Sequence, residues 1–173
     1  GDGDLDLVCA NFSSNTLTVL FQDPTAPQRF TESPQSPLPV GDGPSSVAAA
    51  DLEGDGDLDL VCANAGSGTL TVLLHVPTAP QQRFTAQPPL TVGFFPKSVA
   101  AADLDGDGDL DLVCANPGSD SLTVLFQDAP RSFTTQAHLV VGAATRSVDA
   151  AADLDGDGDL DLVYPTGPSV SGT

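Results

Sequence analysis

The sequence predicts an all-β fold made of repeated antiparallel sheets, and three observations lead to this class. The string GDGDLDL recurs at Gly1, Gly54, Gly106 and Gly156, so the chain repeats with a period of about 50 residues. Each repeat carries short alternating segments such as LDLVCAN and TLTVLF, which are typical of strands. Gly, Pro and β-branched residues leave no capped amphipathic run that is long enough for a helix.

The strands of one repeat can be put in order from their side chains. The Ala-rich run SVAAAD at Ser46 and Ser98 fits a crowded innermost strand, where small side chains let neighbouring sheets converge. The segments LVCAN and TLTVLF predict the second and third strands. A weaker fourth strand follows the Arg-Phe pairs at 29–30 and 83–84, and its prolines suit an outer edge strand. Four short antiparallel strands are the unit of a β-propeller blade.

We therefore expect β-propeller-type repeats of four-stranded antiparallel blades, in an incomplete propeller of about three repeat periods. Residues 1–45 form a partial blade that lacks its first strand and half of its acidic loop. Two complete blades follow at residues 46–97 and 98–146, and residues 147–173 form a partial blade with a tail. Because open strand edges invite pairing, we expect either a longer native chain or self-association into a fibre or ring.

Most acidic residues lie in loops that follow the Ala-rich strands. Complete copies begin at Asp51, Asp103 and Asp153, and a partial copy opens the chain. Carboxylates at positions 1, 3, 5 and 9 would form a cage of oxygen ligands, and glycine at position 6 permits a sharp turn. Position 7 would offer its backbone carbonyl, leaving its side chain to solvent. The predicted metal-ligating residues are Asp51, Glu53, Asp55, Asp57, Asp59, Asp103, Asp105, Asp107, Asp109, Asp111, Asp153, Asp155, Asp157, Asp159 and Asp161, with a partial site of Asp2, Asp4 and Asp6.

Calcium is the cofactor that these loops predict. It takes about 6 to 8 oxygen ligands in flexible geometry, whereas magnesium demands a tight octahedron and zinc prefers His and Cys ligands. Solvated acidic turns are a poor alternative, because so many carboxylates in one short loop would repel each other by on the order of several kcal/mol. An EF-hand is excluded, because Cys62 and Cys114 stand where its bidentate Glu is required.

Composition limits the classes of partner. The chain has 173 residues with 24 acidic and 5 basic side chains, and its net charge of −19 excludes nucleic acid. Its apolar stretches are far shorter than the roughly 20 residues of a membrane span, so no membrane insertion is expected in this segment. Because Cys9, Cys62 and Cys114 occupy one repeat position, we expect free, buried thiols and not a disulfide framework.

The loop DxDGDGxxD, followed by LVxAN and TLTVL, resembles the FG-GAP or VCBS type of repeat over nearly the whole chain. The resemblance implies propeller blades that carry calcium in the turn between their first two strands, as in integrin α-subunit head domains and many secreted or surface proteins. Phe-Gly and Gly-Ala-Pro elements are missing, so integrin-like ligand recognition is not implied.

We therefore expect a calcium-binding structural or adhesive module, extracellular or at the cell surface, with a protein or glycan partner. A ligand-binding or carbohydrate-binding propeller is the first alternative, but only 5% of the residues are aromatic and none is Trp. The second is a catalytic propeller, a lyase or hydrolase. We expect no enzyme, because His75 and His138 lack a matching nucleophile and no residues stand out as breaking the repeat symmetry. The sequon NFS makes Asn11 a candidate for N-glycosylation.

Overall fold

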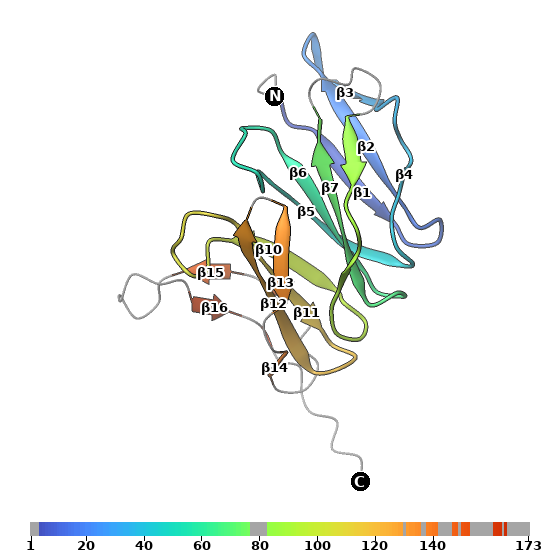
Figure 1. Ribbon diagram of the computed structural model, residues 1–173. Coiled ribbons are helices and arrows are strands. Elements are labelled where there is room, and N and C mark those ends of the chain that lie inside the picture. The colour runs from blue at the N-terminus through green and yellow to red at the C-terminus, as the bar shows by residue number, and fades with distance from the viewer. Residues whose placement is uncertain are drawn as a thin grey trace.

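The computed structural model describes residues 4–76, 83–129, 131–135, 138–141, 147–148, 150–152, 161–163 and 165. All the regular elements in these residues are β-strands, and they form four antiparallel sheets that follow one another along the chain (Figure 1). The predicted all-β class with propeller-type repeats is therefore confirmed. Within this part of the chain, no helix has the length and apolar character needed to cross a membrane.

The sheets share one strand order. The first contains β1 (Leu7–Asn11), β2 (Thr16–Asp23), β3 (Ala26–Glu32) and β4 (Leu38–Pro39). The second contains β5 (Pro44–Ala50), β6 (Asp59–Asn64), β7 (Thr69–His75), β8 (Phe84–Ala86) and β9 (Leu90–Thr91). The third contains β10 (Ser98–Ala102), β11 (Asp111–Asn116), β12 (Ser121–Ala129), β13 (Ser132–Thr135) and β14 (Leu139–Val140). The last pairs β15 (Ala150–Ala152) with β16 (Asp161–Val163).

The second sheet shows how one repeat folds. The Ala-rich, LVCAN and TLTVL segments form β5, β6 and β7, paired in antiparallel order as expected. The outer strand is split, because β8 pairs with one half of β7 and β9 with the other half. Pro88 and Pro89 lie between the two pieces, and proline cannot donate a hydrogen bond to the ladder. The weak fourth strand is thus present as two short pieces.

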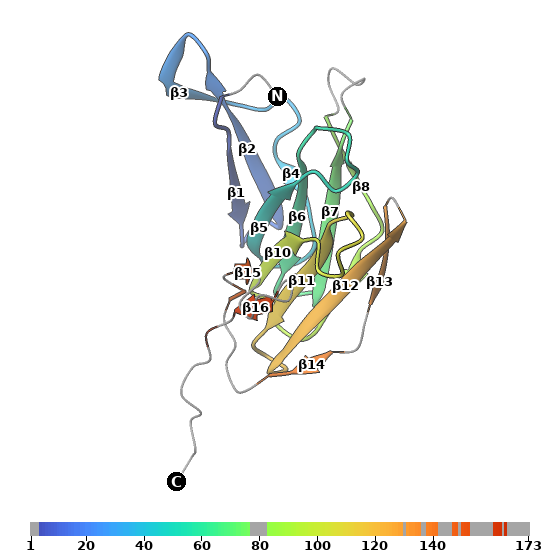
Figure 2. The same ribbon diagram turned by 90° about the vertical axis from the view of Figure 1, so that its left-hand side faces the viewer.

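Neighbouring sheets pack face to face through apolar side chains (Figure 2). Side chains alternate along β6, so Leu60 and Cys62 pack toward the first sheet while Val61 and Ala63 pack toward the third. The inner strand β5 lies beside both β1 and β10. The sheets follow the predicted segments in order, although β5 already begins at Pro44, and the exact blade boundaries stay a prediction.

The three cysteines differ in burial, and this corrects one expectation. None of them forms a disulfide. Cys62 and Cys114 are fully buried, because each packs against the sheet that precedes its own. Cys9 is exposed, and Leu7 on the same face of β1 is 48% exposed, so no other described sheet covers this face. The expectation of a buried thiol was therefore wrong for Cys9.

Candidate metal centre

The last aspartate of the loops 51–59 and 103–111 is buried at the start of the second strand of its sheet. Asp111 accepts hydrogen bonds from the backbone N–H groups of Leu104 and Gln127, both at 2.9 Å. Asp59 makes the two equivalent bonds at 3.0 and 2.7 Å. Burial raises the pKa of Asp59, although these backbone donors act in the opposite direction. This aspartate ties the loop to the third strand of its own sheet.

The first aspartate of the loops 51–59 and 103–111 folds the turn back on itself. Asp103 accepts hydrogen bonds from the backbone N–H groups of Gly106 at 2.8 Å and Gly108 at 3.0 Å. Both glycines have left-handed backbone, with φ of 78° and 96°, which side chains with a Cβ rarely adopt. The sequence predicted this role for position 6 only. Position 4 shares it, with φ of 68° at Gly54, and the repeated Gly-x-Gly could have indicated this.

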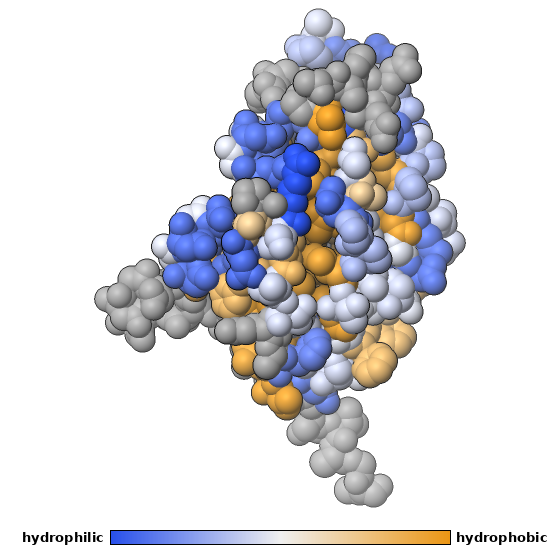
Figure 3. Space-filling view, in the orientation of Figure 1, coloured by the Kyte–Doolittle hydropathy of each residue, from blue (hydrophilic) through white to orange (hydrophobic). Residues whose placement is uncertain are grey.

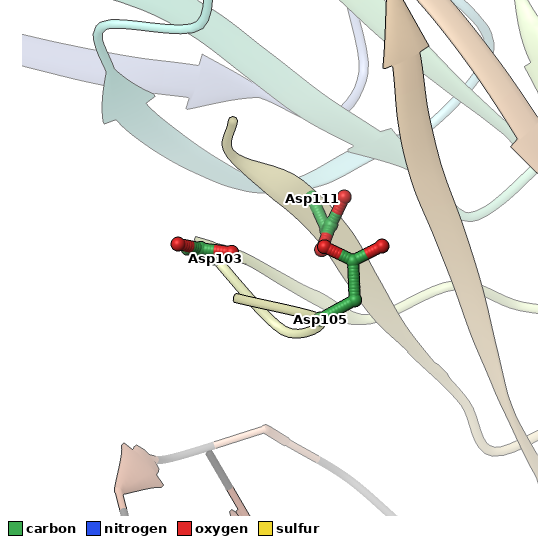
Figure 4. Close-up of side chains that lie close together, drawn as sticks. All are labelled: Asp103, Asp105 and Asp111. Atoms are coloured by element: carbon green, nitrogen blue, oxygen red, sulfur yellow. The ribbon is translucent and has the colours of Figure 1, made fainter. Parts of the chain in front are cut away.

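Three carboxylates of the loop 103–111 converge on one point (Figure 4). Asp103, Asp105 and Asp111 each offer one oxygen atom, and these atoms lie within 4.8 Å of one another. In Figure 4 the side chain of Asp105 reaches from the loop toward Asp111 at the start of β11. Figure 3 shows that hydrophilic residues gather over this loop, which precedes β11.

The electrostatics of this cluster favour a cation. Desolvation raises the pKa of Asp105, and the carboxylates of Asp107, Asp111 and Asp103 raise it further. A set of oxygen donors fits calcium, and a divalent cation would offset the mutual repulsion of the acids. The side chain of Asp107 is not part of the cluster, and it accepts a hydrogen bond from the N–H of Asp109 at 2.9 Å.

The loop 51–59 differs at its third position. The side chain of Glu53 is only 8% exposed and forms an ion pair with Arg131, which lies between β12 and β13 of the next sheet. Asp51 keeps its backbone bonds, since it accepts from the N–H groups of Asp55 and Gly56. Within the described residues, three acidic oxygens come this close together only in the loop 103–111.

The seventh position of the loop 51–59 also has a specific contact. An oxygen of Asp57 lies 3.4 Å from Nδ1 of His75, where we had expected the side chain to face solvent. The N–H of Asp57 in turn donates to Asp55 at 3.0 Å. The ligand roles of Asp55 and Asp57 stay a prediction.

The remaining predicted ligands are only partly described. Asp2, Asp153, Asp155, Asp157 and Asp159 lie outside the described residues, and Asp161 is described by its backbone alone, in β16. Asp4 and Asp6 of the partial site are described. Asp6 accepts a hydrogen bond from the N–H of Gln22 at 2.9 Å, as Asp111 does from Gln127. The proposed ligand roles of these residues stay predictions.

Asn11, the candidate glycosylation site, is engaged in the fold. Its Nδ2 donates hydrogen bonds to Thr16 Oγ1 at 3.2 Å and Thr18 Oγ1 at 2.8 Å. The fully buried Asn64 and Asn116 make the equivalent bonds in the next two sheets. A glycan on Nδ2 would disrupt these bonds, and glycosylation of Asn11 stays a prediction.

Comparison with known families agrees with this repeat geometry. The pattern of the FG-GAP-like repeat matches three consecutive and overlapping stretches, residues 1–62, 51–114 and 103–164. Each stretch spans two successive acidic loops with the blade between them. No curated protein matches the chain. The matches cover most of the sequence and confirm the resemblance inferred from its loops: the chain belongs to the FG-GAP-like repeat family.

Proposed function

We propose that this propeller-type repeat module binds calcium, and that the metal stiffens the loop between the first two strands of each blade. The observation that carries the proposal is the convergence of Asp103, Asp105 and Asp111, whose oxygens lie within 4.8 Å of one another. A bound calcium ion would supply positive charge to a cluster that now contains only acids. Membership of the FG-GAP-like family supports the same proposal.

The proposed role is structural or adhesive and not catalytic. Its support is that both histidines take part in packing contacts. Nδ1 of His138 lies 2.9 Å from Thr123 Oγ1. The ring of His75 stands edge-on to Phe84, with 5.4 Å between the ring centroids. The Thr123 hydroxyl beside His138 is not an accessible nucleophile, because Thr123 is fully buried and its Oγ1 accepts a hydrogen bond from Asn116 Nδ2 at 2.8 Å.

We further propose that the module works outside the cell or on its surface, with a protein or glycan as partner. We expect dissociation constants of about 0.1 to 1 mM, the range of extracellular calcium modules. The net charge of −19 speaks against a nucleic-acid partner.

Calorimetric titration with calcium tests the metal site. We expect Asp105→Asn to remove one binding site, because the amide retains the shape of the side chain but lacks its charge. Glu32→Gln is the matched control, since Glu32 is an exposed acid on β3, away from the loops. If the chain binds no calcium, or if Asp105→Asn and Glu32→Gln bind equally well, the proposal is wrong.

A further inference from the structure

A second site lies at the end of the blades opposite the acidic loops. A hollow of about 370 Å³ opens there between three sheets. Phe12 comes from the turn after β1, Ser45 from β5, Pro117 from the turn after β11, and Phe95 and Lys97 from the segment before β10. The acidic loops precede β6 and β11 while these turns follow the second strands, so the two sites occupy opposite strand ends.

The lining residues break the repeat. The segment GDGPSS at 41–46 becomes GFFPKS at 93–98, so two phenylalanines and a lysine replace Asp, Gly and Ser. Phe12, Phe94 and Phe95 are 60%, 74% and 64% exposed. A contiguous group of exposed, large apolar side chains is typical of an interaction site. The replacement can be read from the sequence, but only the fold brings it beside Phe12 and Pro117.

Phe95 is held in an unfavourable backbone conformation. Its φ is 54°, and the equivalent residue of the preceding blade is Gly43 with φ of 62°. A bulky residue in the left-handed region is an outlier, and such outliers cluster where function requires them. The segment is fixed by backbone bonds, since the N–H of Gly118 donates to the carbonyl of Phe94 at 3.0 Å and the N–H of Phe94 to Ser119 Oγ at 3.1 Å.

The polar groups of the hollow indicate which ligand fits. Lys97 is the only lysine of the chain, its side chain is exposed, and it forms no ion pair with another described residue. The single proton of the Ser45 hydroxyl is already engaged, because its Oγ lies 3.1 Å from the carbonyl oxygen of Ala63 and 2.8 Å from that of Pro96. The hollow therefore combines apolar walls with one cation. A sugar ring would need more hydrogen-bonding partners than these side chains provide.

We propose that this hollow docks a segment of a partner protein in which an apolar side chain stands next to a carboxylate. The apolar side chain packs between Phe12 and Phe95, and the carboxylate pairs with Lys97. The charge match is local, because salt screens the repulsion from more distant acids beyond roughly 8 Å at physiological ionic strength. The inference goes beyond the proposed calcium role and does not depend on it.

Nuclear magnetic resonance titration with short capped peptides tests the docking site. The probe is acetyl-Ala-Phe-Asp-Ala-amide, and the comparison peptides replace its Phe by Ala or its Asp by Lys. We expect the probe to shift the amide signals of Phe12, Phe95, Lys97 and Gly118, with weaker effects from both comparison peptides. Shifts confined to other parts of the chain would overturn the proposal.

Two variants restore the residues of the preceding blade and should therefore fold. Phe95→Gly removes a central anchor and should weaken binding of the probe peptide by roughly tenfold or more. The unfolding temperature of this variant should not fall. Lys97→Ser should abolish the preference for Asp over Lys in the peptide. Phe30→Ala removes an exposed phenylalanine on β3 and should leave binding unchanged. Unchanged binding by Phe95→Gly would refute the site.

Other occupants are distinguishable in the same experiments. Glucuronate that shifts the same signals while the peptide does not would assign the hollow to a glycan and overturn the proposal. Light scattering that shows dimers lost in Phe95→Gly would assign it to a second copy of this chain, with the same consequence. Asp105→Asn should bind the peptide unchanged, so failure of the calcium proposal and failure of this one remain separable.

Discussion

Arg131 forms an ion pair with Glu53 across two blades, so a turn of one sheet holds the acidic loop of the sheet before it. The hydrogen bond that Nε of Arg131 donates to the Glu53 carboxylate raises the pKa of Arg131. A second link runs parallel to it, because Nε2 of Gln127 donates to the backbone carbonyl of Leu52 at 2.9 Å. Glu53 occupies the third ligand position of its loop. Its pairing with Arg131 makes the calcium affinities that we expect for the loops 51–59 and 103–111 unequal.

This inequality predicts that Arg131→Ala tightens calcium binding at the loop 51–59. Without its partner, Glu53 is free to turn toward a cation in its own loop. Because Arg131 is half exposed, the gain is about 1 kcal/mol, or roughly fivefold in affinity. The amide signals of Gly56 and Gly108 report the two loops separately in a calcium titration, and we expect Gly56 to respond at higher calcium in the unmodified chain.

Arg83→Ala is the matched control for this prediction. Its guanidinium lies over the ring of Phe21, 4.7 Å from the centroid, so the variant also removes one positive charge from a blade edge. Both loops should then bind calcium as before. An equal change in Arg83→Ala and Arg131→Ala would show that overall charge is responsible and would refute the specific role of the ion pair.

Removal of calcium should destabilise the fold. The native loops hold clustered carboxylates together, whereas an unfolded chain separates them. With dissociation constants of about 0.1 to 1 mM, each site should add about 1 to 2 kcal/mol at about 5 mM calcium. Thermal unfolding in calcium and in chelator measures this, with magnesium as the control ion. An unfolding temperature that ignores the chelator would contradict the prediction.

The thiols should react unequally in the folded chain. Burial raises the pKa of Cys62 and of Cys114 to about 12, so both remain protonated and inaccessible at neutral pH. Cys9 is exposed and should react at once. An aromatic disulfide reagent at about pH 8 should therefore count one thiol per native chain and three after unfolding. Rapid reaction of all three thiols in native protein would mean that the sheets do not pack as described.

The repeated asparagine offers a paired test of burial. Asn116 is fully buried and its Nδ2 donates to Cys114 O and Thr123 Oγ1, whereas Asn11 is only partly buried. Asn116→Ala should lower the free energy of unfolding by about 2 to 3 kcal/mol, because buried partners lose their donor, and Asn11→Ala by about 1 kcal/mol. Urea denaturation of both variants measures the difference. Equal losses would contradict it.

Local sequence was sufficient to predict the strands and the acidic loops. The alternation of LVCAN and TLTVL and the small side chains of the Ala-rich run each predict an element from residues close together in the chain. The same holds for the aspartates that begin β6 and β11, because the turn glycines and the strand that follows set their position. The convergence of Asp103, Asp105 and Asp111 lies within one such loop.

Only the tertiary structure decided which copies of the repeat behave differently. Cys9 and Cys62 share one motif, but Cys62 has a sheet packed over it and Cys9 does not. Glu53 meets Arg131 across 78 residues, and Phe12 and Phe95 reach one hollow from different blades. Burial and pairing of a side chain depend on the neighbouring sheet, and the packing of sheets brings together residues that no local pattern connects.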